Sequence, residues 1–204
     1  MNFRKTLPIL LLATVICLFA EPSAAETNGR RLAALRDYLS DINSLTGSFI
    51  QEKHIPHIKD PVISKGRFRF QRPDYLWWEY LEPAPSALEL SKGRVRAWNG
   101  PKDDREEQSA AMAEAAKTVA EQVMLWMNMD PDSILAAYEV SFQEAAPIVL
   151  KVVPKQRSAR KYIKSLVVEF ADDSRTVRRV TIKEAEGEII IRFKARAAGQ
   201  DSRK

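Results

Sequence analysis

The chain has 204 residues, of which 29% are charged, and a formal net charge of +5 at pH 7. This length suits one domain with a sizeable core. The basic residues alternate with Asp and Glu instead of clustering, so the composition lacks the electrostatic pattern of a nucleic-acid-binding protein and fits a solvated surface of mixed charge.

The first 25 residues have the three parts of a secretory signal peptide. A short basic start precedes an apolar run, and small residues follow at positions 23–25. The run is short for a membrane span, so an uncleaved anchor is the weaker alternative. We expect cleavage after Ala25, export of the chain and a single mature domain over residues 26–204. The only cysteine, Cys17, lies in the leader, so the mature domain would fold without disulfides.

The chain then contains a helical segment followed by a group of strands. Leucines at positions 32, 35 and 39 recur at helical spacing and predict a helix over about 30–41. Alternating apolar and polar residues, bounded by Gly and Pro, predict strands beyond it, with a tight hairpin at Lys92-Gly93. These strands cover about 46–54, 62–72, 75–81, 86–91 and 93–98.

Residues 102–137 break the strand pattern, because they are rich in Ala, Glu, Gln and Met. Asp103 and Asp104 favour a helix start there through capping and the helix dipole. Asp130 followed by Pro131 fits an N-cap and a first helical position, which predicts a second short helix over 132–137. Strands resume over about 138–144, 147–154, 161–170, 176–184 and 188–195.

This order of elements predicts an α+β domain with about ten antiparallel strands. We expect a strongly curved sheet with the helices covering its concave, apolar side. No internal repeat or low-complexity linker indicates a second domain.

No group of residues indicates an enzyme. The chain has no nucleophile elbow, no Gly-rich phosphate loop and no zinc-binding helix motif. His54 and His57 lack further ligands at metal-binding spacing, so a solvated turn is favoured. Glu79 lies among aromatic residues that could raise its pKa, but a lone carboxylate is more often a hydrogen-bonded structural group. We expect no catalytic residue, no metal and no cofactor.

Apolar side chains at strand spacing exceed what one small domain needs. They form either an ordinary core or the lining of a cavity for an apolar ligand. Four methionines between positions 112 and 129 favour the cavity, because methionine adapts to varied apolar partners. The candidate lining residues are Phe49, Phe68, Phe70, Trp78, Tyr80, Leu88, Leu90, Met112, Val119, Val123 and Trp126.

Strand alternation places Arg72 on the same face as Phe68 and Phe70. A buried charge needs partners, and the five donors of a guanidinium suit backbone carbonyls at the end of a helix. Arg72 would then hold the helices closed over the sheet. In the alternative, the alternation fails before the proline at position 73 and Arg72 points to solvent. The adjacent Trp77 and Trp78 must point to opposite faces, and the sequence offers no reason for Trp77 on the convex side.

Three segments of this chain resemble the LolA-type outer-membrane lipoprotein carriers. They are SLTGSFIQEK at 44–53, GRFRFQRPDYLWWEY at 66–80 and the LEPAPSALEL that follows. The family pattern is a Phe-x-Gln strand, a glycine-led aromatic strand ending in Arg-Pro, and an aromatic strand with Trp. The matching residues are Phe49, Gln51, Gly66, Phe68, Arg72, Pro73, Trp78 and Tyr80.

The resemblance implies an unclosed β-barrel whose concave side is lidded by helices. In this family the acyl chains of a lipoprotein enter that cavity, and the carrier crosses the periplasm as a binding protein. It receives its cargo from an inner-membrane ATP-binding-cassette complex and delivers it to an outer-membrane acceptor. The arginine of Arg-Pro locks the lid by hydrogen bonds and releases it when cargo enters, and Arg72 occupies that position. We expect a monomer.

The chain also departs from the family pattern. The segment after RVRAWNG lacks the usual aromatic and acidic continuation, and the chain ends soon after EIIIRFKAR. Two alternatives therefore stay open, a carrier of another lipid or amphiphile and a periplasmic sensor or regulatory module on the same scaffold. A hydrolase is disfavoured because no nucleophile arrangement is present.

Overall fold

The structure is a computed structural model that describes residues 24–102, 104 and 106–197, without the side chains of residues 24, 25, 110–115, 118 and 119. The described residues form one antiparallel sheet in the order β6-β5-β4-β3-β2-β1-β11-β10-β9-β8-β7. The strands are β1 (Ser44–His54), β2 (Val62–Gln71), β3 (Tyr75–Glu82), β4 (Ser86–Ser91), β5 (Arg94–Asn99), β6 (Glu106–Glu107), β7 (Tyr138–Ala145), β8 (Ile148–Pro154), β9 (Ile163–Phe170), β10 (Val177–Glu184) and β11 (Glu188–Ala197).

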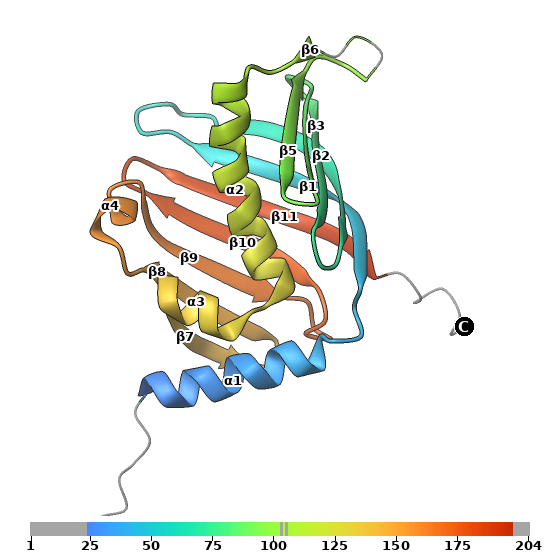
Figure 1. Ribbon diagram of the computed structural model, residues 1–204. Coiled ribbons are helices and arrows are strands. Elements are labelled where there is room, and N and C mark those ends of the chain that lie inside the picture. The colour runs from blue at the N-terminus through green and yellow to red at the C-terminus, as the bar shows by residue number, and fades with distance from the viewer. Residues whose placement is uncertain (1–23, 103, 105, 198–204) are drawn as a thin grey trace, which may run out of the picture.

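The sheet is strongly curved and unclosed, and the longer helices lie on its concave side (Figure 1). The α+β fold expected from the sequence is therefore confirmed. The helices are α1 (Ala24–Tyr38), α2 (Ala110–Asn128), α3 (Pro131–Ala137) and the short α4 (Arg157–Arg160). No helix of the described residues is long and apolar enough to cross a membrane.

β2 shows why the two faces of the sheet differ. Gly66, Phe68 and Phe70 are buried on the concave side, while Arg67 and Arg69 alternate with them and are exposed on the convex side. The same alternation continues in β1 and β3, because the register places apolar residues of neighbouring strands opposite one another, as with Phe68 and Trp78.

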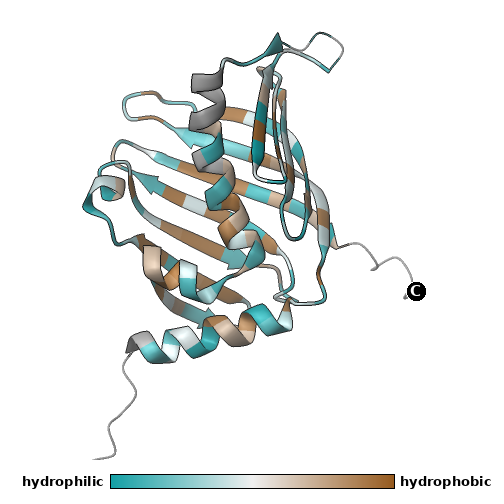
Figure 2. Ribbon diagram, in the orientation of Figure 1, coloured by the Kyte–Doolittle hydropathy of each residue, from teal (hydrophilic) through white to brown (hydrophobic). Residues whose placement is uncertain are grey.

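The helices pack over the two ends of the sheet and form two cores. α2 packs against β4 and β5, whereas α1 packs against α3 and β7 (Figure 1). Figure 2 shows hydrophobic positions on α2 and on the strands behind it. The core under α2 consists of Phe70, Leu76, Leu90, Ala120 and Met124. The core beside α1 and α3 includes Leu32, Leu35, Leu39, Met129, Ile134, Leu150, Val152 and Phe170.

The predicted strands and the predicted hairpin are present in the structure. The hairpin residues Lys92 and Gly93 have φ angles of 51° and 74°, as a two-residue type I′ turn requires. The predicted start of the long helix is wrong, because α2 begins only at Ala110. The residues before it form β6, which pairs with Trp98 and Asn99 of β5.

The structure does not bear on the expected signal peptide or on the expected capping role of Asp103. Most of the expected signal peptide, residues 1–23, and Asp103 lie outside the described residues. The first helix runs from Ala24 to Tyr38 instead of over about 30–41, and α4 had no sequence prediction.

Candidate functional site

Five aromatic side chains gather on the concave side of the sheet. The ring centroids of Phe49 and Trp78 are 4.3 Å apart and stacked, and Tyr80 meets Phe49 edge-on at 5.2 Å. Phe193 of β11 lies 5.8 Å from Phe68 and 6.1 Å from Trp78. We call Phe49, Phe68, Trp78, Tyr80 and Phe193 the aromatic group. These centroid distances are those at which aromatic pairs add to the stability that burial provides.

The group depends on the absence of a side chain at Gly66. Phe49 is the direct cross-strand partner of Gly66, and its ring lies over that residue. A Cβ atom at Gly66 would come within 2.3 Å of both the Phe49 ring and the Glu79 carbonyl oxygen. The glycine therefore lets Phe49 lie flat against the sheet and reach Trp78.

One polar pair accompanies the aromatic group. The Tyr80 hydroxyl donates a hydrogen bond to Gln51 Oε1 at 3.0 Å. Burial raises the pKa of Tyr80, so the hydroxyl remains a neutral donor at physiological pH. The Tyr80 hydroxyl and Gln51 Oε1 are thus paired with each other within an otherwise apolar face.

The apolar face continues beyond the aromatic group across β11, β10 and β9. Five of the concave positions there are half-buried rather than buried, although they carry large aliphatic side chains. They are Leu166, Val180, Ile182, Ile189 and Ile191.

The structure divides the predicted cavity-lining residues into separate groups. Phe70 and Leu90 are only 1% and 6% exposed, because α2 covers them, and Leu88 and Val123 pack beside them. Residues in this group can contact a ligand only after α2 moves. Trp126 belongs to the other core, where its ring centroid lies 5.6 Å from that of Tyr138.

Two of the predicted lining residues, Met112 and Val119, have side chains outside the described set. Sequence reasoning did not choose Phe193, although strand alternation in β11 places it on the same side as Ile189 and Ile191. Met124, one of the four methionines that favoured a cavity, is buried one turn of α2 beyond the buried Ala120.

Arg72 lies directly after β2 and reaches the end of α1. Its Nη1 donates to the carbonyl oxygen of Ser40 at 3.3 Å, and its backbone N–H donates to the Asn43 carbonyl at 2.9 Å. Its Nε is buried and has no hydrogen-bond partner among the described residues. The guanidinium is thus held by one long hydrogen bond, and the lock role stays a prediction.

The next residue, Pro73, connects the same corner to α2. Asn128, in the last turn of α2, donates from Nδ2 to the Pro73 carbonyl oxygen at 2.9 Å. The helix ends at once, because Met129 adopts a left-handed conformation with φ of 51°. The Arg72-Pro73 corner therefore contacts the carboxyl ends of both α1 and α2. Sequence reasoning did not identify Asn128, since it gives no apolar or charged pattern.

The convex side explains the position of Trp77. Its ring centroid lies 5.7 Å from that of Trp98, and Arg96 stacks on Trp98 with Cζ 4.9 Å from the ring centroid. Glu79, only 3% exposed, accepts hydrogen bonds from Arg67 Nε and, at 3.5 Å, from Trp77 Nε1. Glu79 is therefore a hydrogen-bonded group of the convex side, away from the aromatic group.

The site is thus an aromatic concave side of an unclosed, strongly curved sheet, with helices packed over it. The chain belongs to the LolA family, since the family model described as "Outer membrane lipoprotein carrier protein LolA" matches residues 40–202. An outer-membrane lipoprotein carrier protein of Alkalilimnicola ehrlichii is 37% identical over 89 residues, which are 44% of this chain and 40% of that relative.

Comparison with solved structures finds similar chains at low sequence identity. A crystal structure of MucB is 12% identical with a TM-score of 0.50, over 85% of this chain and 60% of that one. The lipoprotein LppX of Mycobacterium tuberculosis is 12% identical with a TM-score of 0.46, over 83% of this chain and 94% of that one. The LolA superfamily protein NE2245 of Nitrosomonas europaea is 10% identical with a TM-score of 0.40, over 83% and 93% of the two chains.

Proposed function

We propose that this protein is a periplasmic carrier that binds the acyl chains of lipoproteins against its concave face and moves them from the inner to the outer membrane. The observation that carries the proposal is the aromatic group, which continues into half-buried aliphatic side chains of β9–β11. A continuous apolar face of this kind is suited to a long hydrocarbon chain.

The energetics favour uptake by displacement of α2. Each methylene that leaves water contributes about 0.8 kcal/mol, so an acyl chain gains several kcal/mol on burial. The polar links at the Arg72-Pro73 corner contribute only about 1 kcal/mol each. The chain would also replace the contacts that α2 makes with Phe70 and Leu90. Acyl burial is therefore large enough to open the helices, while the polar links favour their return.

In this mechanism Arg72 and the Asn128–Pro73 hydrogen bond set the balance between the open and the closed protein. Cargo stabilises the open state, and transfer to a higher-affinity acceptor lets the helices close. The donor would be an inner-membrane ATP-binding-cassette complex and the acceptor an outer-membrane protein, as in the carriers that the chain resembles. No bond is made or broken, so the activity is binding and release.

Mass spectrometry of material that co-purifies with the protein from the periplasm tests the proposal. We expect an acylated lipoprotein in complex with the native chain, and loss of that complex when Trp78 is replaced by Glu. Trp78 is half-buried on the concave face, so the carboxylate would meet the acyl chain; because Trp78 also packs beside the core under α2, circular dichroism must show that the variant folds.

The same experiment separates the alternatives. Free phospholipid or another amphiphile in place of a lipoprotein would contradict the lipoprotein cargo and indicate a carrier of that compound. The absence of any apolar ligand, with a protein partner recovered instead, would indicate a regulatory module.

A further inference from the structure

The outer edge of β5 is only partly paired. β6 pairs with Trp98 and Asn99, and the Gln108 N–H donates to the Ala97 carbonyl at 2.8 Å. Backbone groups of a strand point alternately to its two sides, so the N–H and C=O of Val95 face the same outer edge as those of Ala97. Within the described part of the chain, no strand pairs with the outer edge of β5 before Trp98.

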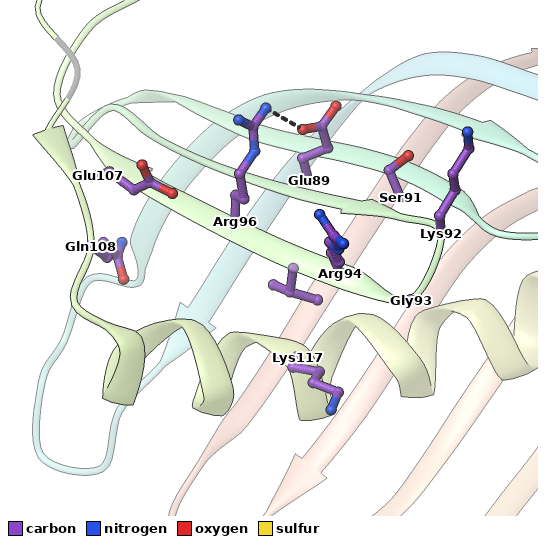
Figure 3. A pocket seen from close by; sticks show the side chains of 10 residues that line it. Glu89, Ser91, Lys92, Gly93, Arg94, Arg96, Glu107, Gln108 and Lys117 are labelled. Carbon is purple, nitrogen blue, oxygen red and sulfur yellow. Dashed lines mark hydrogen bonds and ion pairs between the residues drawn. The ribbon is translucent and has the colours of Figure 1, made fainter.

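A pocket of about 1050 Å³ runs along this unpaired edge. Figure 3 shows side chains of β5, β6 and α2 around it, with Arg94 and Arg96 on β5 and Lys117 on α2. Val95 and Gln108 also line the pocket, so it lies where the next strand of the sheet would continue from β6. The edge from Arg94 to Ala97 can pair with a segment of about four residues, roughly 13 Å long.

The pocket is positively charged. Arg96 is balanced by Glu89, with Nη2 and Oε2 2.9 Å apart. Lys92 and Arg94 have no ion-pair partner among the described residues. Both lie beside the unpaired outer edge of β5.

We propose that this edge is a docking site for an extended acidic segment of a partner protein, which adds to the sheet as a strand beside β5. The outward N–H and C=O of Val95, which no strand of the described residues pairs, recognise a main chain, as in other cases of β-augmentation, and a lipid cannot supply one. Lys92 and Arg94 select carboxylates. A second copy of this edge would bring like charges together, so self-pairing is disfavoured. The site lies at the edge strand β5, and no residue of the aromatic group lines it.

The experiment uses the mature protein and a short acetylated and amidated peptide that alternates glutamate with valine. NMR shift perturbation and calorimetry measure its binding. We expect saturable binding, shifts centred on residues 94–97 and slower amide exchange at Val95. The substitution Arg94→Glu should weaken binding about tenfold or more, since an attractive charge becomes repulsive. Arg196→Glu is the matched control, because Arg196 is exposed on β11, far from this edge, and should leave affinity unchanged.

A second pair of measurements tests the main-chain contacts. Val95→Pro removes the outward N–H but no hydrogen bond to β4, so the sheet should persist while binding is lost. A peptide with N-methyl groups on one edge should fail to bind the unaltered protein, which makes the test independent of the variant's folding. Equal affinity for Arg94→Glu, full binding of the N-methylated peptide, or shifts confined to the concave face would each overturn the proposal. Preferential binding of Lys92 and Arg94 to vesicles of anionic phosphatidylglycerol would also overturn the proposal. Self-association of the protein through β5 would do the same.

Discussion

Arg72 makes fewer hydrogen bonds than its five donors allow. One long hydrogen bond to Ser40 holds the guanidinium, and the buried Nε has no partner among the described residues. An unsatisfied buried donor costs about 1–3 kcal/mol, so the side chain gains little from its present position. A group held this weakly can change partners when the helices move.

We predict that Arg72→Leu loads cargo but transfers it slowly. The leucine removes the hydrogen bond that favours closing, so cargo release should slow by about tenfold for a loss of roughly 1.4 kcal/mol. Reconstituted transfer to outer-membrane acceptor, measured beside loading, separates the two steps. Arg69→Leu is the control, because Arg69 is exposed on the convex side. A normal transfer rate for Arg72→Leu would contradict the lock role.

Gly66 gives a second prediction for a single residue. Gly66→Ala should lower the free energy of unfolding by about 1–3 kcal/mol, because the new Cβ meets the Phe49 ring and the Glu79 carbonyl. Adding Phe49→Leu should recover part of that loss, as denaturant unfolding of the double variant would measure. Gly93→Ala meets no atom within 4 Å and should show no such recovery. Additive effects at positions 66 and 49 would contradict the proposed contact.

The residues that could be predicted from the sequence are those controlled by strand alternation. The concave positions of Phe49, Phe68 and Trp78 follow from the period of two within each strand. The partner of Trp77 could not be found in that way. Trp98 lies two strands away in the sheet, and only the register of β3, β4 and β5 brings the two rings together.

At the scale of elements, α3 begins with a polar contact that responds to pH. The Ser133 hydroxyl donates to the Asp130 carboxylate, and this hydrogen bond is the main cause of the lowered pKa of Asp130. A lowered pKa in the folded state means that the contact stabilises the protein above the ordinary pKa of 3.8 and is lost as pH falls through the folded-state pKa.

We therefore predict that Ser133→Ala raises the pKa of Asp130 toward its ordinary value, as carboxyl NMR titration would measure. The variant should be less stable than the unaltered protein at neutral pH, and the difference should disappear in acid. Ser158→Ala, in the short α4, is a control that should leave the Asp130 titration unchanged. An equal difference in stability at neutral and acid pH would show that the serine acts by another route.

The boundaries of the strands could be predicted because Gly, Pro and charged turns separate short alternating runs. The start of α2 could not, because Asp104 and the acidic residues after it look like a helix start. Tertiary pairing with β5 turns Glu106 and Glu107 into a strand instead. The apolar surface of α2 also divides, with Met124 facing β4 and β5 and Trp126 facing the core beside α3. A single helical stripe could not show that division.

At the scale of the whole molecule, three of the four tryptophans lie on the two faces of the sheet. Trp78 belongs to the aromatic group, whereas Trp77 and Trp98 pack together on the convex side. Lipid on the concave face should therefore contact one member of the adjacent pair only.

We predict that a cargo with brominated acyl chains quenches the fluorescence of a variant that keeps only Trp78. A variant that keeps only Trp77 should be unaffected, since its ring is separated from the cargo by the sheet. The two variants differ by one position in sequence, so each is the control of the other. Equal quenching of both would contradict uptake on the concave face.

The pairing of β1 with β11 has a consequence for how the protein is made. These strands lie side by side in the middle of the sheet, with Leu45 opposite Ala197, yet they come from opposite ends of the domain. Loop closure over so many residues is slow, and β1 keeps an open edge until β11 arrives. A chain that emerges from its amino terminus therefore cannot complete the aromatic group until β11, which carries Phe193, has emerged. Truncations before Phe193 should leave an aggregation-prone half-sheet rather than a smaller carrier.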